Sequence, residues 1–197
     1  MPEAPRNGLG HLVLVVGPSG AGKDTLIAGA RARLIDENQF VFPARIVTRA
    51  ASAAEMHGTS DETAFAVAHS EGAFALSWRA HGLSYGLPAS IDDDIAKGLI
   101  VVANVSRHVI GEARARYRHV SVVLVDAPPS VRAARLAARG RETPRDIAER
   151  LSRKVEIFDA QDADLSIDNA GTVEAGVGLF MGFLEDLNKS HATAGDR

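Results

Sequence analysis

The amino-acid sequence predicts an α/β fold in which a parallel sheet is flanked by helices. Two observations support this prediction. Short apolar runs rich in Val, Ile and Leu alternate with stretches of helical periodicity, and a glycine-rich stretch joins the first strand candidate to the first helix candidate. Strands that alternate with helices need crossover connections, which favour parallel strands with helices on both faces of the sheet.

The elements follow in order along the chain. The apolar run His11–Val16, HLVLVV, is expected to be a strand buried on both faces, and Gly17 closes it. A helix is expected from Gly22, because the apolar residues that follow recur at helical spacing. Further strands are predicted at residues 40–47, 73–78, 99–105, 120–125 and 164–167. Further helices are predicted at residues 61–70, 90–97, 106–117, 130–139, 144–158 and 173–187.

The composition limits the class of protein. The 197 residues suit one domain, expected at residues 11–188 between flexible ends at 1–10 and 189–197. The absence of cysteine excludes disulfides, thiolate nucleophiles and cysteine-based zinc sites. A formal net charge of −3 argues against general nucleic-acid binding. With no signal-peptide layout and no apolar run near the roughly 18 residues of a membrane span, we expect a cytoplasmic protein without membrane contact.

The glycine-rich stretch GPSGAGKDT is close to the phosphate-binding pattern G-x-x-x-x-G-K-[ST]. A strand is predicted before it and a helix after it, so its backbone N–H groups would surround a phosphate at a helix N-terminus. This predicts a P-loop NTPase fold that binds ATP. A turn that only joins strand to helix would need no lysine there. The predicted nucleotide-binding residues are Gly17, Pro18, Ser19, Gly20, Ala21, Gly22, Lys23, Asp24 and Thr25.

Asp24 replaces the hydroxyl residue of the pattern. Its carboxylate would repel a triphosphate unless a divalent cation lay between them. We therefore expect Asp24 to face Mg²⁺, directly or through water, with Thr25 supplying a hydroxyl one residue later. An acidic residue that only stabilises the helix N-terminus remains the alternative.

The chain resembles the guanylate kinase group, and more closely the ribose 1,5-bisphosphate phosphokinases of phosphonate breakdown, from about residue 11 to 187. The stretches that carry the resemblance are GPSGAGKDT, RIVTRAASAAEMHG, FALSWRAHGLSYGLP, VVANVSR, RLAARGRE and SIDNAG. The resemblance implies a guanylate-kinase-like domain with an acceptor-binding segment at about residues 45–88 and a lid at about 135–155.

Two arginines, Arg45 and Arg49, flank Thr48 at the end of a predicted strand. Paired guanidinium groups suit a second phosphate, apart from the one held by the glycine loop. The resemblance gives both arginines the acceptor phosphate and places Tyr85 in the acceptor region. Solvated arginines and a packed tyrosine are the alternatives.

Guanylate kinases read guanine with two carboxylates, and this chain has neither. FALSW stands at the first place and Asn104 at the second. The polar set Asn104, Ser106 and Arg107 suits hydroxyls and a further phosphate, so the loss of both acids argues against GMP as the acceptor.

A basic cluster, RLAARGRE, precedes a predicted helix. Positioned positive charge is the main device of phosphoryl transfer, and the resemblance gives lid roles to Arg139 and Arg150, which together with Lys23 are the predicted catalytic residues. Asn169 is placed near the adenine of ATP, or in an ordinary turn.

The resemblance implies an enzyme that phosphorylates ribose 1,5-bisphosphate with ATP and Mg²⁺ to give 5-phosphoribosyl-1-diphosphate. A nucleoside monophosphate kinase is the first alternative. A non-catalytic guanylate-kinase-like interaction module is the second, and the intact residues 17–23 speak against it. The expected partners are a small phosphorylated sugar and ATP, and the sequence leaves the oligomeric state open.

Overall fold

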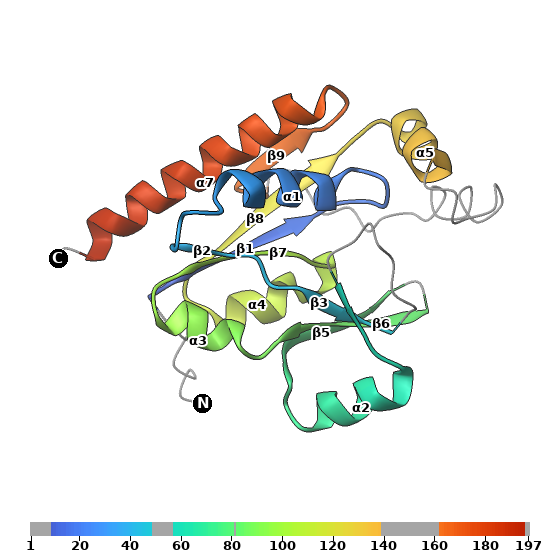
Figure 1. The fold of residues 1–197 in the computed structure, drawn as a ribbon, viewed down its shortest axis with the longest axis vertical. Helices are drawn as coiled ribbons and strands as arrows, with labels where there is room; N and C mark the ends of the chain where they lie inside the picture. The colour runs from blue at the N-terminus through green and yellow to red at the C-terminus, as the bar shows by residue number, and fades with distance from the viewer. Residues whose placement is uncertain (1–8, 49–56, 81, 139–161, 196–197) are drawn as a thin grey trace. The chain divides into compact units, whose positions relative to one another are not determined.

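The computed structural model describes residues 9–48, 57–80, 82–138 and 162–195. The chain forms two compact units, with boundaries after Leu14, Arg33 and Ser121. The first unit holds residues up to 14 and 34–121, and the second unit holds residues 15–33 and those from 122 onward. Figure 1 labels the helices and strands within them.

A five-stranded sheet has the order β2 (Phe40–Val41), β7 (Ile100–Asn104), β1 (His11–Val16), β8 (Val120–Asp126) and β9 (Leu165–Asp168). β2 pairs in parallel with β7, and β8 with β9. The residues of β1 from Leu12 onward are buried, as expected for a strand covered on both faces. The predicted parallel sheet flanked by helices is confirmed.

The second unit contains three described helices, α1 (Lys23–Arg33), α5 (Pro129–Ala138) and α7 (Val173–Gly195). α1 lies beside α7, as Figure 1 shows. The buried side chains of α7 end at Leu184, which is why the periodicity predicted an end near residue 187. The helix continues to Gly195 because no proline or glycine occurs between Leu187 and that residue.

The first unit contains a second sheet that the sequence did not predict. Its order is β4 (His57–Thr59), β3 (Arg45–Val47), β6 (Leu83–Pro88) and β5 (Phe74–Ala80). β3 pairs in parallel with β4 and antiparallel with β6, and β5 also pairs antiparallel with β6.

The prediction of one strand at residues 40–47 was wrong. This segment forms β2 in the five-stranded sheet and β3 in the four-stranded sheet. Pro43 lies between the two strands; proline lacks the N–H group that a continuous ladder needs. The strand β6 was missed because its sequence, LSYGLP, contains a glycine and a proline and no β-branched residue.

The helix α2 (Glu62–Ser70) covers one face of the four-stranded sheet, below it in Figure 1. The carboxylate of Asp61 caps this helix by accepting a 2.7 Å hydrogen bond from the backbone N of Ala64. The Phe65 ring stacks on Phe74 of β5, with ring centroids 4.5 Å apart. Gly86 makes room for the Phe74 ring, since a Cβ there would come within 2.5 Å of it.

The first unit also contains α3 (Ile91–Ala96), the 3₁₀ helix η1 (Arg107–Val109) and α4 (Ile110–Arg116). The helix predicted at residues 106–117 is therefore a 3₁₀ turn followed by an α-helix. Buried Tyr117 donates a 2.7 Å hydrogen bond to Asp92, which also pairs with Arg116. Burial is the first cause that raises the pKa of Tyr117, so its phenol stays protonated.

None of the helices in the described ranges has the length and apolar character needed to cross a membrane.

Candidate functional site

The loop between β1 and α1 depends on three glycines with positive φ: Gly17 at 144°, Gly20 at 82° and Gly22 at 98°. A Cβ at Gly17 would lie 1.9 Å from the carbonyl oxygen of Val125, and one at Gly20 would lie 2.9 Å from that of Arg132. These positions therefore require glycine for backbone conformation and for close packing. The loop lets its main chain approach β8 and α5.

Lys23 begins α1, and its ammonium group is held over the loop. Its Nζ donates hydrogen bonds of 2.7 Å to the carbonyl oxygen of Gly17 and 3.1 Å to that of Pro18. The backbone N of Leu26 donates to the carbonyl oxygen of Gly22, which starts the helical ladder at the loop. This geometry places a positive charge at the N-terminal end of a helix, a combination that attracts phosphate.

The loop is anchored to the rest of its unit at the carbonyl oxygen of Ala21. This oxygen accepts hydrogen bonds from the side-chain amide of Asn169 at 2.7 Å and from Nη1 of Arg135 at 3.3 Å. Nη2 of Arg135 also donates to the carbonyl oxygen of Asn169 at 2.9 Å, which closes the group. We call these three residues the loop clamp.

Asn169 is 4% exposed, and its side chain lies against the loop. Its Nδ2 contacts the protein main chain. Its Oδ1 is buried and has no hydrogen-bond partner among the residues that the structure describes. Gly176 of α7 allows this close packing, since a Cβ there would come within 2.7 Å of Oδ1. The sequence gave no signal for the bond to Ala21, because 148 residues separate the two.

Asp24 lies in the first turn of α1 and is partly buried, whereas Thr25 is exposed. Ser19 and Asp24 both make interactions within the protein. The described part of the chain contains no group of three or more His, Asp or Glu side chains that could hold a metal ion by themselves. Mg²⁺ is usually held by one or two carboxylates together with substrate phosphates, so Asp24 fits such an ion only with a nucleotide present.

In the first unit, Arg45, Tyr85 and Trp78 lie on one face of the four-stranded sheet. Tyr85 stands opposite both Val47 of β3 and Trp78 of β5, so these side chains point to the same side. The rings of Trp78 and Tyr85 are parallel within 2°, with centroids 5.4 Å apart. The guanidinium carbon of Arg45 lies 5.9 Å from the centroid of Tyr85. We call these three residues the aromatic stack.

Alternation along β6 points Ser84 to the opposite face, beneath α2. Glu62 of α2 accepts a 2.8 Å hydrogen bond from the Ser84 hydroxyl and pairs with Arg79 at 3.1 Å. The backbone N of Ser84 also donates to the Thr48 hydroxyl at 2.9 Å. Hydrogen bonds from Ser84 and Thr48 hold the pKa of Glu62 below its usual value, so the carboxylate stays charged.

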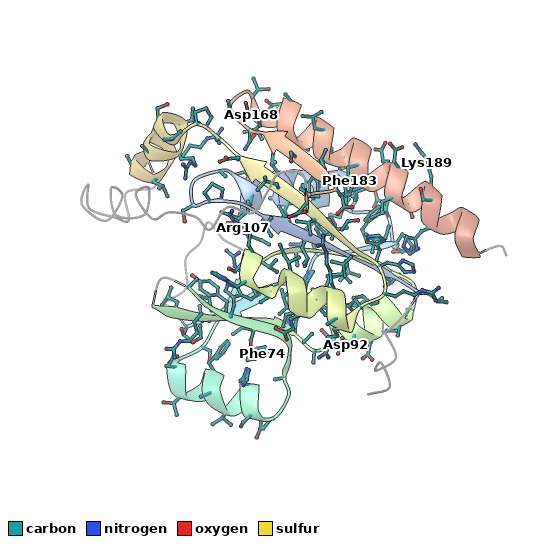
Figure 2. The ribbon with its side chains drawn as sticks, turned by 180° about the vertical axis from the view of Figure 1, so that it is seen from behind. Phe74, Asp92, Arg107, Asp168, Phe183 and Lys189 are labelled. Carbon is teal, nitrogen blue, oxygen red and sulfur yellow. The ribbon has the colours of Figure 1, made fainter. Side chains whose placement is uncertain are left out.

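The predicted polar set lies at the end of β7 and in η1, where Asn104, Ser106 and Arg107 are partly buried. β5, the strand of Trp78, packs against η1. In Figure 2, Phe74 lies on the α2 side of the four-stranded sheet, and Arg107 lies beyond the other side of it. The structure thus brings the η1 segment to the sheet that carries Arg45 and Tyr85.

Three predicted site residues, Arg49, Arg139 and Arg150, lie outside the described residues, as does the helix predicted at 144–158. Arg135, Trp78 and Glu62 were not among the predicted site residues. Arg135 belongs to the basic cluster RLAARGRE and precedes Arg139 by four residues in the sequence, which was a usable signal. Trp78 and Glu62 gave none, because their partners come from other elements.

Curated relatives cover most of the chain. It is 54% identical over 172 residues to a ribose 1,5-bisphosphate phosphokinase PhnN from Bradyrhizobium diazoefficiens, covering 87% of this chain and 86% of that protein. A protein of the same name from Methylobacterium radiotolerans is 52% identical over 165 residues, covering 84% and 92%. Another from Brucella melitensis is 48% identical over 179 residues, covering 90% and 93%. No family model matches the chain.

Solved structures share the fold. A guanylate kinase from Anaplasma phagocytophilum superposes with a TM-score of 0.66 at 17% identity, covering 91% of this chain and 87% of that one. A gluconokinase from Sinorhizobium meliloti superposes with a TM-score of 0.52 at 17% identity, covering 96% and 99%. These similarities confirm the predicted P-loop kinase fold.

Proposed function

The chain belongs to the ribose 1,5-bisphosphate phosphokinase family, and from this premise we propose that it transfers the γ-phosphoryl group of ATP to ribose 1,5-bisphosphate. The bond between the γ-phosphorus and the bridging oxygen of ADP breaks, and an oxygen of the 1-phosphate forms the new P–O bond. The products are ADP and 5-phosphoribosyl-1-diphosphate. The observation that carries the proposal is the 54% identity over 172 residues with a relative of that name.

The donor residues belong to the second unit. The glycines of the loop leave a cradle that a Cβ would fill, and Lys23 already projects its ammonium group along the carbonyl oxygens of Gly17 and Pro18. Backbone N–H groups at the start of α1 would hold the phosphates of ATP, and Lys23 would neutralise the charge on the β and γ oxygens. Asn169 would maintain the shape of the loop at Ala21.

Mg²⁺ would neutralise negative charge on the phosphates of ATP. Asp24 would hold it, directly or through a water molecule, with the hydroxyl of Thr25 one residue later. The partly buried position of Asp24 at the start of α1 supports this assignment.

The acceptor residues belong to the first unit, within the proposed acceptor segment at residues 45–88 and in the η1 segment. Arg45 and Arg49 would bind one phosphate, and the phenol O–H of Tyr85 would donate a hydrogen bond to the sugar or to a phosphate. The remaining hydroxyls and the second phosphate would contact Asn104, Ser106 and Arg107. Small phosphorylated sugars, not nucleic acids, are the proposed substrates.

The proposed lid at residues 135–155 would supply Arg139 and Arg150. Each would place a positive charge on the transferring phosphoryl group and help to exclude water. Phosphoryl transfer is governed by positioning and charge, so no covalent intermediate on the protein is required.

A guanylate-type kinase is the second candidate, favoured by the similarity of the fold to a guanylate kinase. A site that reads guanine needs acceptors for the N–H donors of the base, and a missing partner of this kind can change selectivity by a factor of about 10⁴. Asn104 and the stretch FALSW stand at the two places where the guanylate kinase pattern has an acidic residue. These replacements favour the sugar.

The test is steady-state kinetics of purified protein with ATP, Mg²⁺ and either ribose 1,5-bisphosphate or GMP. The sugar should be turned over far better. In Arg45→Ala, KM for the sugar should rise about tenfold to a hundredfold while KM for ATP changes little, since a charged hydrogen bond is lost on one ligand only.

Arg79→Ala is the matched control, because Arg79 lies on the α2 face of the same sheet and pairs with Glu62. It should leave both KM values close to those of the wild type. GMP turnover at or above that of the sugar would overturn the proposed function, and equal KM changes in the two variants would overturn the role of Arg45.

A further inference from the structure

The aromatic stack joins three planar groups from three strands. The sheet order is β4-β3-β6-β5, so Arg45 on β3 and Trp78 on β5 are separated by β6. Tyr85 of β6 contacts both, with its ring parallel to that of Trp78 and the guanidinium of Arg45 near its face. The indole of Trp78 and the guanidinium of Arg45 are therefore linked by their shared contact with the Tyr85 ring.

Parallel stacking restricts the phenol ring more than ordinary burial would. An aromatic pair in offset contact has a preferred geometry, and its interaction exceeds that of the buried area alone. The planes of Trp78 and Tyr85 lie within 2° of each other, so any turn of the Tyr85 ring would break this parallel contact. The orientation of the indole thus determines that of the phenol.

The orientation of the phenol matters to Arg45. A guanidinium group can stack its flat face on an aromatic ring while the N–H groups at its edge remain available to donate to an anion. The cost of ordering a long side chain is then met before the anion arrives, which raises affinity. If the Tyr85 ring lost its support, Arg45 would have to be ordered by the ligand itself.

We propose that Trp78 is a positioning residue for the phosphorylated acceptor. It acts through Tyr85 on Arg45, and does not itself need to touch the sugar. This inference rests on the proposed function, since it assigns Arg45 to the acceptor phosphate. It adds Trp78 to the residues proposed to recognise the acceptor and explains why an indole lies partly buried on a face of the sheet that α2 does not cover.

The closing experiment compares Trp78→Leu, Trp78→Phe and Phe74→Leu in the full chain. Trp78→Leu should raise KM for ribose 1,5-bisphosphate about fivefold to tenfold with little change in KM for ATP, the size expected for lost aromatic and cation–π contacts. Trp78→Phe should restore most of the loss, because a phenyl ring can still stack on Tyr85.

Phe74→Leu is the control, because Phe74 lies on the same strand but stacks on Phe65 beneath α2. It should lower the melting temperature and leave both KM values unchanged. If Trp78→Leu and Phe74→Leu lowered the melting temperature equally and neither changed KM for the acceptor, the positioning role would be refuted.

A second readout separates this inference from the proposed function. Trp78 is the only tryptophan of the chain, so its fluorescence reports on the stack alone. Ribose 5-phosphate and ribose 1,5-bisphosphate should each change it in a saturable manner, and Arg45→Ala should weaken both responses. A fluorescence response without turnover of the bisphosphate would support the stack and overturn the proposed reaction. Turnover of the bisphosphate, with no fluorescence change on binding and an unchanged acceptor KM in Trp78→Leu, would support the proposed reaction and overturn the role of the stack.

Discussion

The glycine loop and the aromatic stack are built in opposite ways. The loop is one continuous stretch, residues 17–25, and its shape comes from main-chain conformation at three glycines. The stack takes Arg45, Trp78 and Tyr85 from three strands, and strand register alone brings them together. The loop should therefore tolerate changes around it but not within it, whereas the stack should depend on the packing of its whole sheet.

The loop should give the largest single effect. Lys23→Ala should lower kcat/KM about 10³-fold, because it removes a fixed positive charge from the reacting phosphates. The fold should persist, since Lys23 is partly buried and its Nζ donates to loop carbonyls, those of Gly17 and Pro18. Turnover by coupled assay and melting by circular dichroism measure the two quantities.

Lys189→Ala provides the matched control for this prediction. Lys189 forms an exposed pair with Asp186 on α7, 3.0 Å apart, and such surface pairs contribute little. Its kinetics should match those of the wild type. A Lys23→Ala protein that kept most of its kcat/KM would contradict the assignment of the loop.

The second effect tests the glycines of the loop themselves. A Cβ at Gly22 would lie 2.3 Å from the Nδ2 of Asn169, at a φ of 98° that disfavours alanine. Gly22→Ala should therefore displace the loop and lower kcat/KM for ATP about 100-fold, as misplacement of about 1 Å can do.

Gly98→Ala separates the clash from the backbone strain. Gly98 has a φ of 85°, but a Cβ there would meet nothing within 4 Å. Gly98→Ala should cost about 1 kcal/mol of stability and leave turnover unchanged. Equal losses of activity in the two variants would show that the contact at Gly22 does not matter.

The same difference explains how far the sequence predicted this molecule. The loop could be predicted because its residues are contiguous and the positive φ of its glycines is a local requirement, whereas the close approach of β8, α5 and Asn169 to those glycines is not visible in the sequence. Asn169 was placed near the nucleotide from its position in SIDNAG, but its bond to Ala21 depends on how β9 and α7 pack. Arg45 and Tyr85 were assigned to the acceptor region, whereas Trp78 was not, because its partnership with Tyr85 depends on antiparallel pairing that helical and strand periodicity do not encode.

A substitution in the loop clamp should weaken ATP binding less than the loop substitutions lower kcat/KM. Asn169→Ala removes one hydrogen bond to Ala21, while Arg135 still donates to the same oxygen. The expected cost is about 1 kcal/mol, or about a fivefold rise in KM for ATP with the acceptor KM unchanged. Titration of an ATP analogue into the two proteins checks the affinity directly. An unchanged affinity with a lowered melting temperature would mean that Asn169 only packs the fold.

The smallest effect concerns the face of the sheet opposite the stack. Hydrogen bonds from Ser84 and Thr48 lower the pKa of Glu62 from 4.5. A carboxyl whose pKa is lower in the folded chain stabilises it above the unfolded pKa, and this contribution is lost as the pH falls through the folded value. Glu62→Gln should therefore melt below the wild type at neutral pH, and the gap should narrow steadily as the pH drops below about 4.5.

The control for Glu62→Gln is Glu37→Gln, an exposed position between α1 and β2 that lies at no helix end. This variant should melt like the wild type at each pH. Because Ser84 precedes Tyr85 on β6, Glu62→Gln should also raise KM for the acceptor slightly while KM for ATP stays constant, which extends the contrast with the loop. A melting gap that stayed constant down to the most acidic pH at which both proteins fold would show that Glu62 acts by packing alone. The charge of Glu62 would then contribute nothing to the stability of the four-stranded sheet.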